Sequence, residues 1–124
     1  MLIALGAQYL LGMYVNMFAA PPDDPKFKTE GLFPKVVFGT HALLGLGILV
    51  GSVAVLILAI KSRESNLKKI GTYGFLSVFL AFCGGIATIS LKDNASEISS
   101  YVMSAGFLLS FVFYGKLFYL LKKP

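Results

Sequence analysis

One histidine, His41, is the side chain of this sequence best suited to chemistry. It opens a long apolar stretch, and Gly45 follows it by about one helical turn. An imidazole at such a place suits two roles. It could be an axial haem ligand, with Gly45 leaving room for the flat macrocycle. It could equally be a neutral hydrogen-bonding group that fixes the register of two membrane helices.

Polar and thioether groups on other apolar stretches could complete a site around His41. Asn16 lies near the end of the first stretch, and a methionine such as Met13, Met17 or Met103 is a candidate second axial ligand. The hydrogen-bonding role is the favoured interpretation; in the alternative, His41, Asn16, Gly45 and Met13 form a site for haem b or a quinone. We expect Asn16 and His41 to face one interior cavity within hydrogen-bond or one-water reach, because lipid would leave either group without a partner. Two hydroxyls are expected at the same shallow level, those of Thr88 and Ser104.

The residue inventory argues against several other kinds of site. The chain has one His and one Cys, Cys83, and no acid lies within its apolar stretches. A Ser-His-Asp triad and a zinc centre need more ligands or acids than this. Coupled transporters normally carry an intramembrane acid. No catalytic residue and no metal ligand set is predicted.

Four apolar stretches must position these groups, and each is long enough to cross a bilayer as a helix. A membrane helix needs about 20 residues. The chain is 56% hydrophobic, and Pro21, Pro22 and Pro25 end the first stretch. The predicted spans are 2–20, 36–60, 70–91 and 98–121. We therefore expect an all-α fold: a single domain over 1–124 that forms an antiparallel four-helix transmembrane bundle.

The charges lie between the stretches and predict how the bundle is oriented. The net charge is +5, and the loop 61–69 and the C-terminal tail hold seven of the eleven basic residues with one of the six acids. The positive-inside rule places that side, and so both termini, in the cytoplasm. We expect no nucleic-acid partner and, since no basic segment precedes Leu2, no cleaved signal peptide.

Small and polar residues recur at helical spacing within the stretches. Membrane helices associate by close backbone approach at small residues and by interhelical hydrogen bonds. These positions should therefore face neighbouring helices, and Gln8 is read as interhelical packing or as the lining of a pore or quinone-sized cleft. The predicted helix-packing residues are Gln8, Gly12, Gly47, Gly51, Ala81 and Gly85.

Two segments also carry a family resemblance. The run Gln8 to Met17, followed by His41-Ala-Leu-Leu-Gly45, resembles a family of small uncharacterised four-helix membrane proteins of bacteria and archaea. That resemblance implies a multi-pass protein of a prokaryotic cytoplasmic membrane and no known activity. The His-x-x-x-Gly pattern is more loosely similar to four-helix haem-binding modules such as haem A synthase. This chain lacks the second His of those modules.

These observations favour a non-catalytic membrane protein. It would be an accessory or structural subunit that contacts lipid and either other membrane subunits or copies of itself. The alternative from a different class is a membrane redox protein in which His41 holds haem or hydrogen-bonds a quinone. A small channel or carrier rests on less, namely Gln8 and the glycine stripes.

Overall fold

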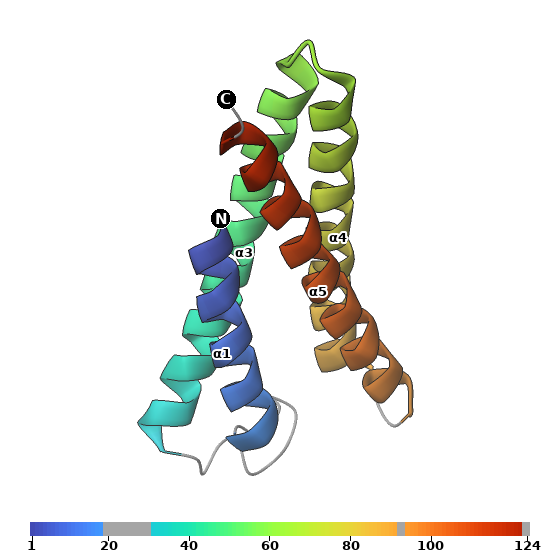
Figure 1. The fold of residues 1–124 in the computed structure, drawn as a ribbon. Helices are drawn as coiled ribbons and strands as arrows, with labels where there is room; N and C mark the ends of the chain where they lie inside the picture. The colour runs from blue at the N-terminus through green and yellow to red at the C-terminus, as the bar shows by residue number, and fades with distance from the viewer. Residues whose placement is uncertain (19–30, 92–93, 123–124) are drawn as a thin grey trace.

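The computed structural model describes residues 1–18, 31–91 and 94–122, and the described chain is helical (Figure 1). Its helices are α1 (Leu2–Phe18), α3 (Leu32–Lys61), α4 (Ser65–Ser90) and α5 (Asn94–Lys122). Within the described ranges, α3, α4 and α5 are long and apolar enough to cross a membrane. Helix α1 is also apolar but has 17 residues. The last two residues of its predicted span, 19 and 20, lie outside the described residues.

Each long helix extends beyond the predicted apolar span into polar sequence. Helix α3 begins four residues before the predicted start, and Pro34 is accommodated in its first turn, where a backbone N–H would have no intrahelical partner. It ends at a turn in which the backbone N–H of Ser62 donates to the carbonyl of Leu58, 3.1 Å away. Hydropathy locates the part of a helix that lipid can cover, whereas hydrogen bonds and caps set where it ends.

Helices α4 and α5 form the closest pair in the described fold. Backbone meets backbone at two glycines: a Cβ on Gly84 would lie 2.7 Å from the Met103 nitrogen, and one on Gly106 would lie 2.8 Å from the Ala81 nitrogen. Further along, Tyr114 packs its ring on Gly74. Residue numbers fall from Gly84 to Gly74 along α4 while those of their contacts rise from Met103 to Tyr114 along α5, so the two helices run in opposite directions. Small residues allow this approach, which maximises dispersion contacts.

A buried cluster joins this pair to the other two helices. Its members are Leu5, Ile48, Ile70, Val78, Tyr114 and Leu117. Tyr114 is only 3% exposed, so it belongs to this core rather than to an interfacial aromatic belt. Tyr73, Tyr101 and Tyr119 lie near helix ends and are exposed, as tyrosines at a membrane interface would be. Helix α3 meets α4 where Ala59 packs on Gly71.

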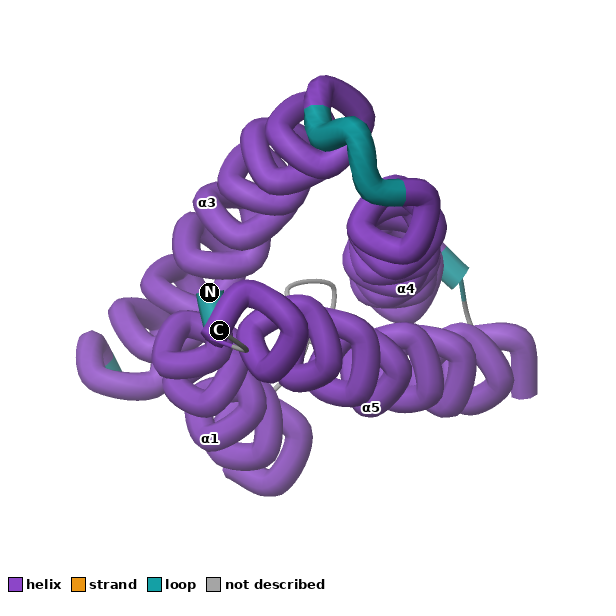
Figure 2. Tube along the Cα trace, turned by 45° about the horizontal axis from the view of Figure 1, so that its top comes forward, coloured by secondary structure: helices purple, strands orange, loops and turns teal. Residues whose placement is uncertain are grey.

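Helices α1 and α3 form the second pair, which diverges from the first at one end. Figure 1 shows α1 and α3 on one side, α4 and α5 on the other, and the two pairs separating away from the α3–α4 turn. Seen from the tilted view of Figure 2, α5 likewise leads from the chain termini out to a distant end beside α4. Tyr9 of α1 stacks on Phe107 of α5 with ring centroids 6.1 Å apart. The splay separates residues that a parallel-sided bundle would bring to one level.

Candidate interaction site between helices α1 and α3

The α1–α3 interface pairs two glycines with two polar side chains in a reciprocal pattern. On α1, a Cβ on Gly12 would lie 3.0 Å from Cε1 of His41. On α3, a Cβ on Gly45 would lie 3.0 Å from Nε2 of Gln8. Gln8 and Gly12 are one turn apart, as are His41 and Gly45, so each glycine makes room for the polar group of the opposite helix. The interface therefore has a defined register.

The two polar side chains meet within that register. Nε2 of Gln8 and Nε2 of His41 are 3.4 Å apart in a partly buried contact between residues 33 positions apart in the chain. An amide N–H that donates to the imidazole lone pair would place the ring proton on Nδ1. Gln8 Oε1 and His41 Nδ1 are buried and accept or donate no hydrogen bond within the described part of the chain. The contact is long and only partly satisfied, so it fixes register more than it adds stability.

His41 does not fit an axial haem ligand while α1 and α3 are packed. Its Cε1 edge faces Gly12, and a Cβ there would lie 3.6 Å from Nδ1 and 3.8 Å from Nε2. Nε2 lies 3.4 Å from the Gln8 amide nitrogen and Nδ1 is buried, whereas an iron must approach one of the two nitrogens along its lone pair. Gly45, the expected gap for a macrocycle, is covered by Gln8. The Gln8 side chain also blocks the approach of a quinone to the imidazole.

The remaining predicted partners of His41 lie elsewhere or outside the description. The side chain of Asn16 is outside the described residues, so the expected Asn16–His41 contact stays a prediction. Met13 is 44% exposed. Thr88 donates to the Gly84 carbonyl at 2.8 Å, and the exposed Ser104 donates to the Ser100 carbonyl at 2.9 Å. These hydroxyls belong to the α4–α5 pair, so the structure does not gather them around His41.

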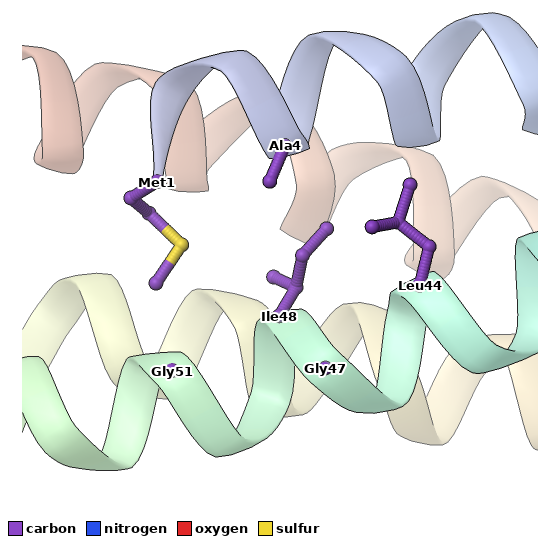
Figure 3. Close-up of a pocket in the computed structure, with 6 residues that line it drawn as sticks. All are labelled: Met1, Ala4, Leu44, Gly47, Ile48 and Gly51. Atoms are coloured by element: carbon purple, nitrogen blue, oxygen red, sulfur yellow. The ribbon is translucent and has the colours of Figure 1, made fainter.

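A shallow groove continues the same interface toward the N-terminus, as Figure 3 shows. Its lining residues are Met1, Ala4, Leu44, Gly47, Ile48 and Gly51. Leu44 and Ile48 point from α3 toward α1, while the glycines leave the adjacent strip of α3 without side chains (Figure 3). A Cβ on Gly47 would have nothing within 4 Å, and one on Gly51 would meet only the methyl end of Met1 at 3.4 Å.

The other predicted packing residues lie in the α4–α5 pair. The Ala81 backbone approaches Gly106, and a Cβ on Gly85 would lie 3.3 Å from the sulfur of Met103. Eight glycines thus have a neighbour within 4 Å of an added Cβ in the described fold: Gly12, Gly45, Gly51, Gly71, Gly74, Gly84, Gly85 and Gly106. Gly47 does not, although it stands four residues from Gly51 in a G-x-x-x-G arrangement. That arrangement is a common face for helix association in membranes.

The spacing of polar residues and glycines in the sequence indicates the partner of His41, although estimates of depth in the membrane do not. Counting residues from the span ends placed Gln8 deeper than His41 and apart from it. The informative signal is the matched spacing, because Gln8 with Gly12 mirrors His41 with Gly45 when the helices run in opposite directions. Leu44 and Ile48, the walls of the groove, carry no distinguishing pattern among so many apolar residues.

Comparison with known proteins does not assign the chain to a family. No family model matches the chain, and no curated protein or solved structure matches it either. Among the described residues, no three His, Cys, Asp or Glu side chains are grouped so that they could hold a metal ion. The arguments for function therefore rest on the packing itself.

Proposed function

We propose that this chain is a non-catalytic integral membrane protein that serves as an accessory or structural subunit of a larger membrane assembly. Its partner, another membrane subunit or a second copy, packs on the groove along α3. The observation that carries the proposal is the G-x-x-x-G face of the groove. A Cβ on Gly47 would have nothing within 4 Å, as is also true of Gly6, Gly31, Gly39 and Gly115, but among these five described glycines Gly47 is the one that lines a groove with a second glycine four residues away.

The physics of membrane association favours this use of the groove. Lipid tails are as apolar as Leu, so helices gain little from hiding hydrophobic surface, and close backbone approach supplies the attraction. Gly47 offers that approach, and Leu44 and Ile48 rise beside it as a wall. The wider apolar surface, including Leu43 at 73% and Val50 at 63% exposed, suits either lipid or a partner helix.

The proposed setting is a prokaryotic cytoplasmic membrane, crossed by an antiparallel four-helix bundle with both termini inside. Three helices have the length and composition to span. The fourth span is α1, whose 17 residues cover about 25 Å at 1.5 Å per residue and need a small adjustment of the bilayer or of the helix ends. The excess of Lys and Arg at the α3–α4 turn and the C-terminal end favours the cytoplasmic side for both.

The redox alternative has less support. A haem or quinone at His41 requires α1 to move from α3, because Gln8 of α1 lies against Nε2 and Nδ1 is buried. The visible spectrum of the purified chain tests the haem form of this alternative, and extraction of the purified protein with organic solvent followed by chromatography tests for a bound quinone. We expect a colourless preparation; a Soret band that disappears in His41→Ala would favour the redox protein instead.

Site-specific photocrosslinking tests the assembly proposal. A photoreactive phenylalanine analogue at Leu43 or Val50, which flank the open glycines on α3, should crosslink to a protein partner in native membranes. The same analogue at Leu76, a 50% exposed position on α4, is the matched control. The proposal predicts a discrete crosslinked protein band from α3 and none from Leu76. If all three positions give lipid adducts only, the proposal is wrong.

A further inference from the structure

A group of unpaired cations lies at one end of the molecule, on three different helices. Its six members, called here the basic rim, are Lys61, Arg63, Lys68, Lys69, Lys116 and Lys122. All six are exposed. Glu64 is the single acid among the residues that link them, and no rim side chain forms an ion pair within the described part of the chain. The rim therefore carries a positive charge that the described chain leaves unneutralised.

The fold brings the three sources of the rim to the same end. Lys61 and Arg63 lie at the α3–α4 turn, and Lys68 and Lys69 follow in the first turns of α4. The buried cluster that contains Ile70 of α4 and Leu117 of α5 packs these turns against the end of α5. Lys116 and Lys122 thus lie at the same end of the molecule as the α4 lysines. Figure 1 shows the chain's C-terminus on the same half of the molecule as the α3–α4 turn.

Exposed apolar side chains surround the cations of the rim, and they indicate which class of anion the rim can bind. Lys122 lies over the ring of Phe118, with its ammonium 4.5 Å from the ring centroid. Phe118 is 50%, Tyr119 67% and Leu121 66% exposed, so large apolar groups stand between and beside the cations. Lys116 lies about 9 Å before Lys122 along α5 by helical rise, and a long lysine stem can carry its charge over part of that distance.

Such a surface matches a molecule that is anionic at one end and apolar at the other. Lysines and arginines at the edge of membrane helices attract the phosphates of acidic lipids, and exposed aromatic rings sit at the level of the headgroups. A soluble anion would gain nothing from Phe118, Tyr119 and Leu121. We propose that the basic rim binds the phosphate headgroups of anionic phospholipids, whose acyl chains lie against the end of α5. This inference does not depend on the partner that covers the α3 groove.

Native mass spectrometry of the full chain tests the proposal. The protein is released from micelles that hold equimolar phosphatidylglycerol and phosphatidylcholine, and the two kinds of lipid adduct are counted. The rim variant combines Lys68→Gln, Lys69→Gln, Lys116→Gln and Lys122→Gln. The charge-matched control combines Lys26→Gln, Lys28→Gln, Lys35→Gln and Lys92→Gln, which removes four cations that do not belong to the rim. Far-ultraviolet circular dichroism confirms that each variant keeps its helix content.

The wild type and the control variant should retain phosphatidylglycerol over phosphatidylcholine by about fivefold or more, and the rim variant should retain them about equally. Equal retention by the wild type, or an unchanged preference in the rim variant, would overturn the proposal. A third arm adds inorganic phosphate in large molar excess. If phosphate alone abolishes the preference, the rim is a simple anion site and the lipid assignment is wrong.

Discussion

Gln8 and His41 meet across the α1–α3 interface with their Nε2 atoms 3.4 Å apart. Each stands opposite a glycine of the other helix: Gln8 opposite Gly45, and His41 opposite Gly12. This arrangement explains a histidine within an apolar helix without any cofactor. The imidazole fills the space that Gly12 leaves, and its polar edge finds the amide of Gln8 rather than lipid.

Replacing His41 with Ala should loosen α1 from α3 without unfolding the protein. Polar contacts between membrane helices average about 0.6 kcal/mol, and loss of the ring adds a packing defect, so we expect a loss of about 1–3 kcal/mol. Unfolding of the purified protein in mixed detergent micelles measures it. Thr40→Ala is the matched control, because Thr40 is exposed and its hydroxyl donates to the Val36 carbonyl of its own helix. Equal losses in both variants would contradict a specific role for His41.

The sequence predicts the positions of the helices well, but it predicts the contacts of His41 only in part. Apolar length located α3, α4 and α5 to within about five residues at each end, since lipid imposes a helix on any span of that kind. The partner of His41 was harder to predict, because helical rise gives depth along an axis and not rotation about it. Asn16 was chosen by depth, whereas the structure brings Gln8 to His41 through the reciprocal glycines.

Methyl groups added at the α4–α5 crossing should destabilise the protein. In Gly84→Ala or Gly106→Ala the new Cβ would lie within 3.0 Å of partner backbone, so the helices must shift apart. Overpacking of this kind costs about 1–3 kcal/mol. Gly115→Ala on α5 is the control, because its Cβ would have nothing within 4 Å. Thermal unfolding in detergent should show lower midpoints for the first two variants only; an unchanged midpoint for both would contradict the close crossing.

Cysteine labelling tests the proposed orientation. In a Cys83→Ala background, Ser65→Cys should react with a membrane-impermeant maleimide only after the cell interior is opened. Asn94→Cys, at the start of α5, should react in intact cells. Both positions are exposed, so access to the reagent depends on the side of the membrane. Labelling of residue 65 from outside would contradict cytoplasmic termini.

Glycine spacing shows a second limit of what sequence predicts. Gly12, Gly47, Gly51 and Gly85 were all expected at helix contacts, because small residues permit close approach. The spacing cannot say which neighbour approaches. In the fold, Gly12 and Gly85 meet side chains of this chain, whereas a Cβ on Gly47 would meet none within 4 Å. That difference becomes visible only when all the described helices are placed, and it is the basis of the proposed assembly.

The size of the native assembly tests the central proposal most directly. Membranes that carry the chain at its natural level are solubilised in a mild detergent, and particle size is measured by native gel electrophoresis for the wild type, Gly47→Ile and Gly115→Ile. A Cβ on either glycine would have nothing within 4 Å, and only the first substitution extends into the α3 groove; far-ultraviolet circular dichroism confirms that both variants keep their helix content. We predict a large particle for the wild type and Gly115→Ile and a single-chain particle for Gly47→Ile. A single-chain particle for the wild type, or an unchanged assembly in Gly47→Ile, would contradict the account.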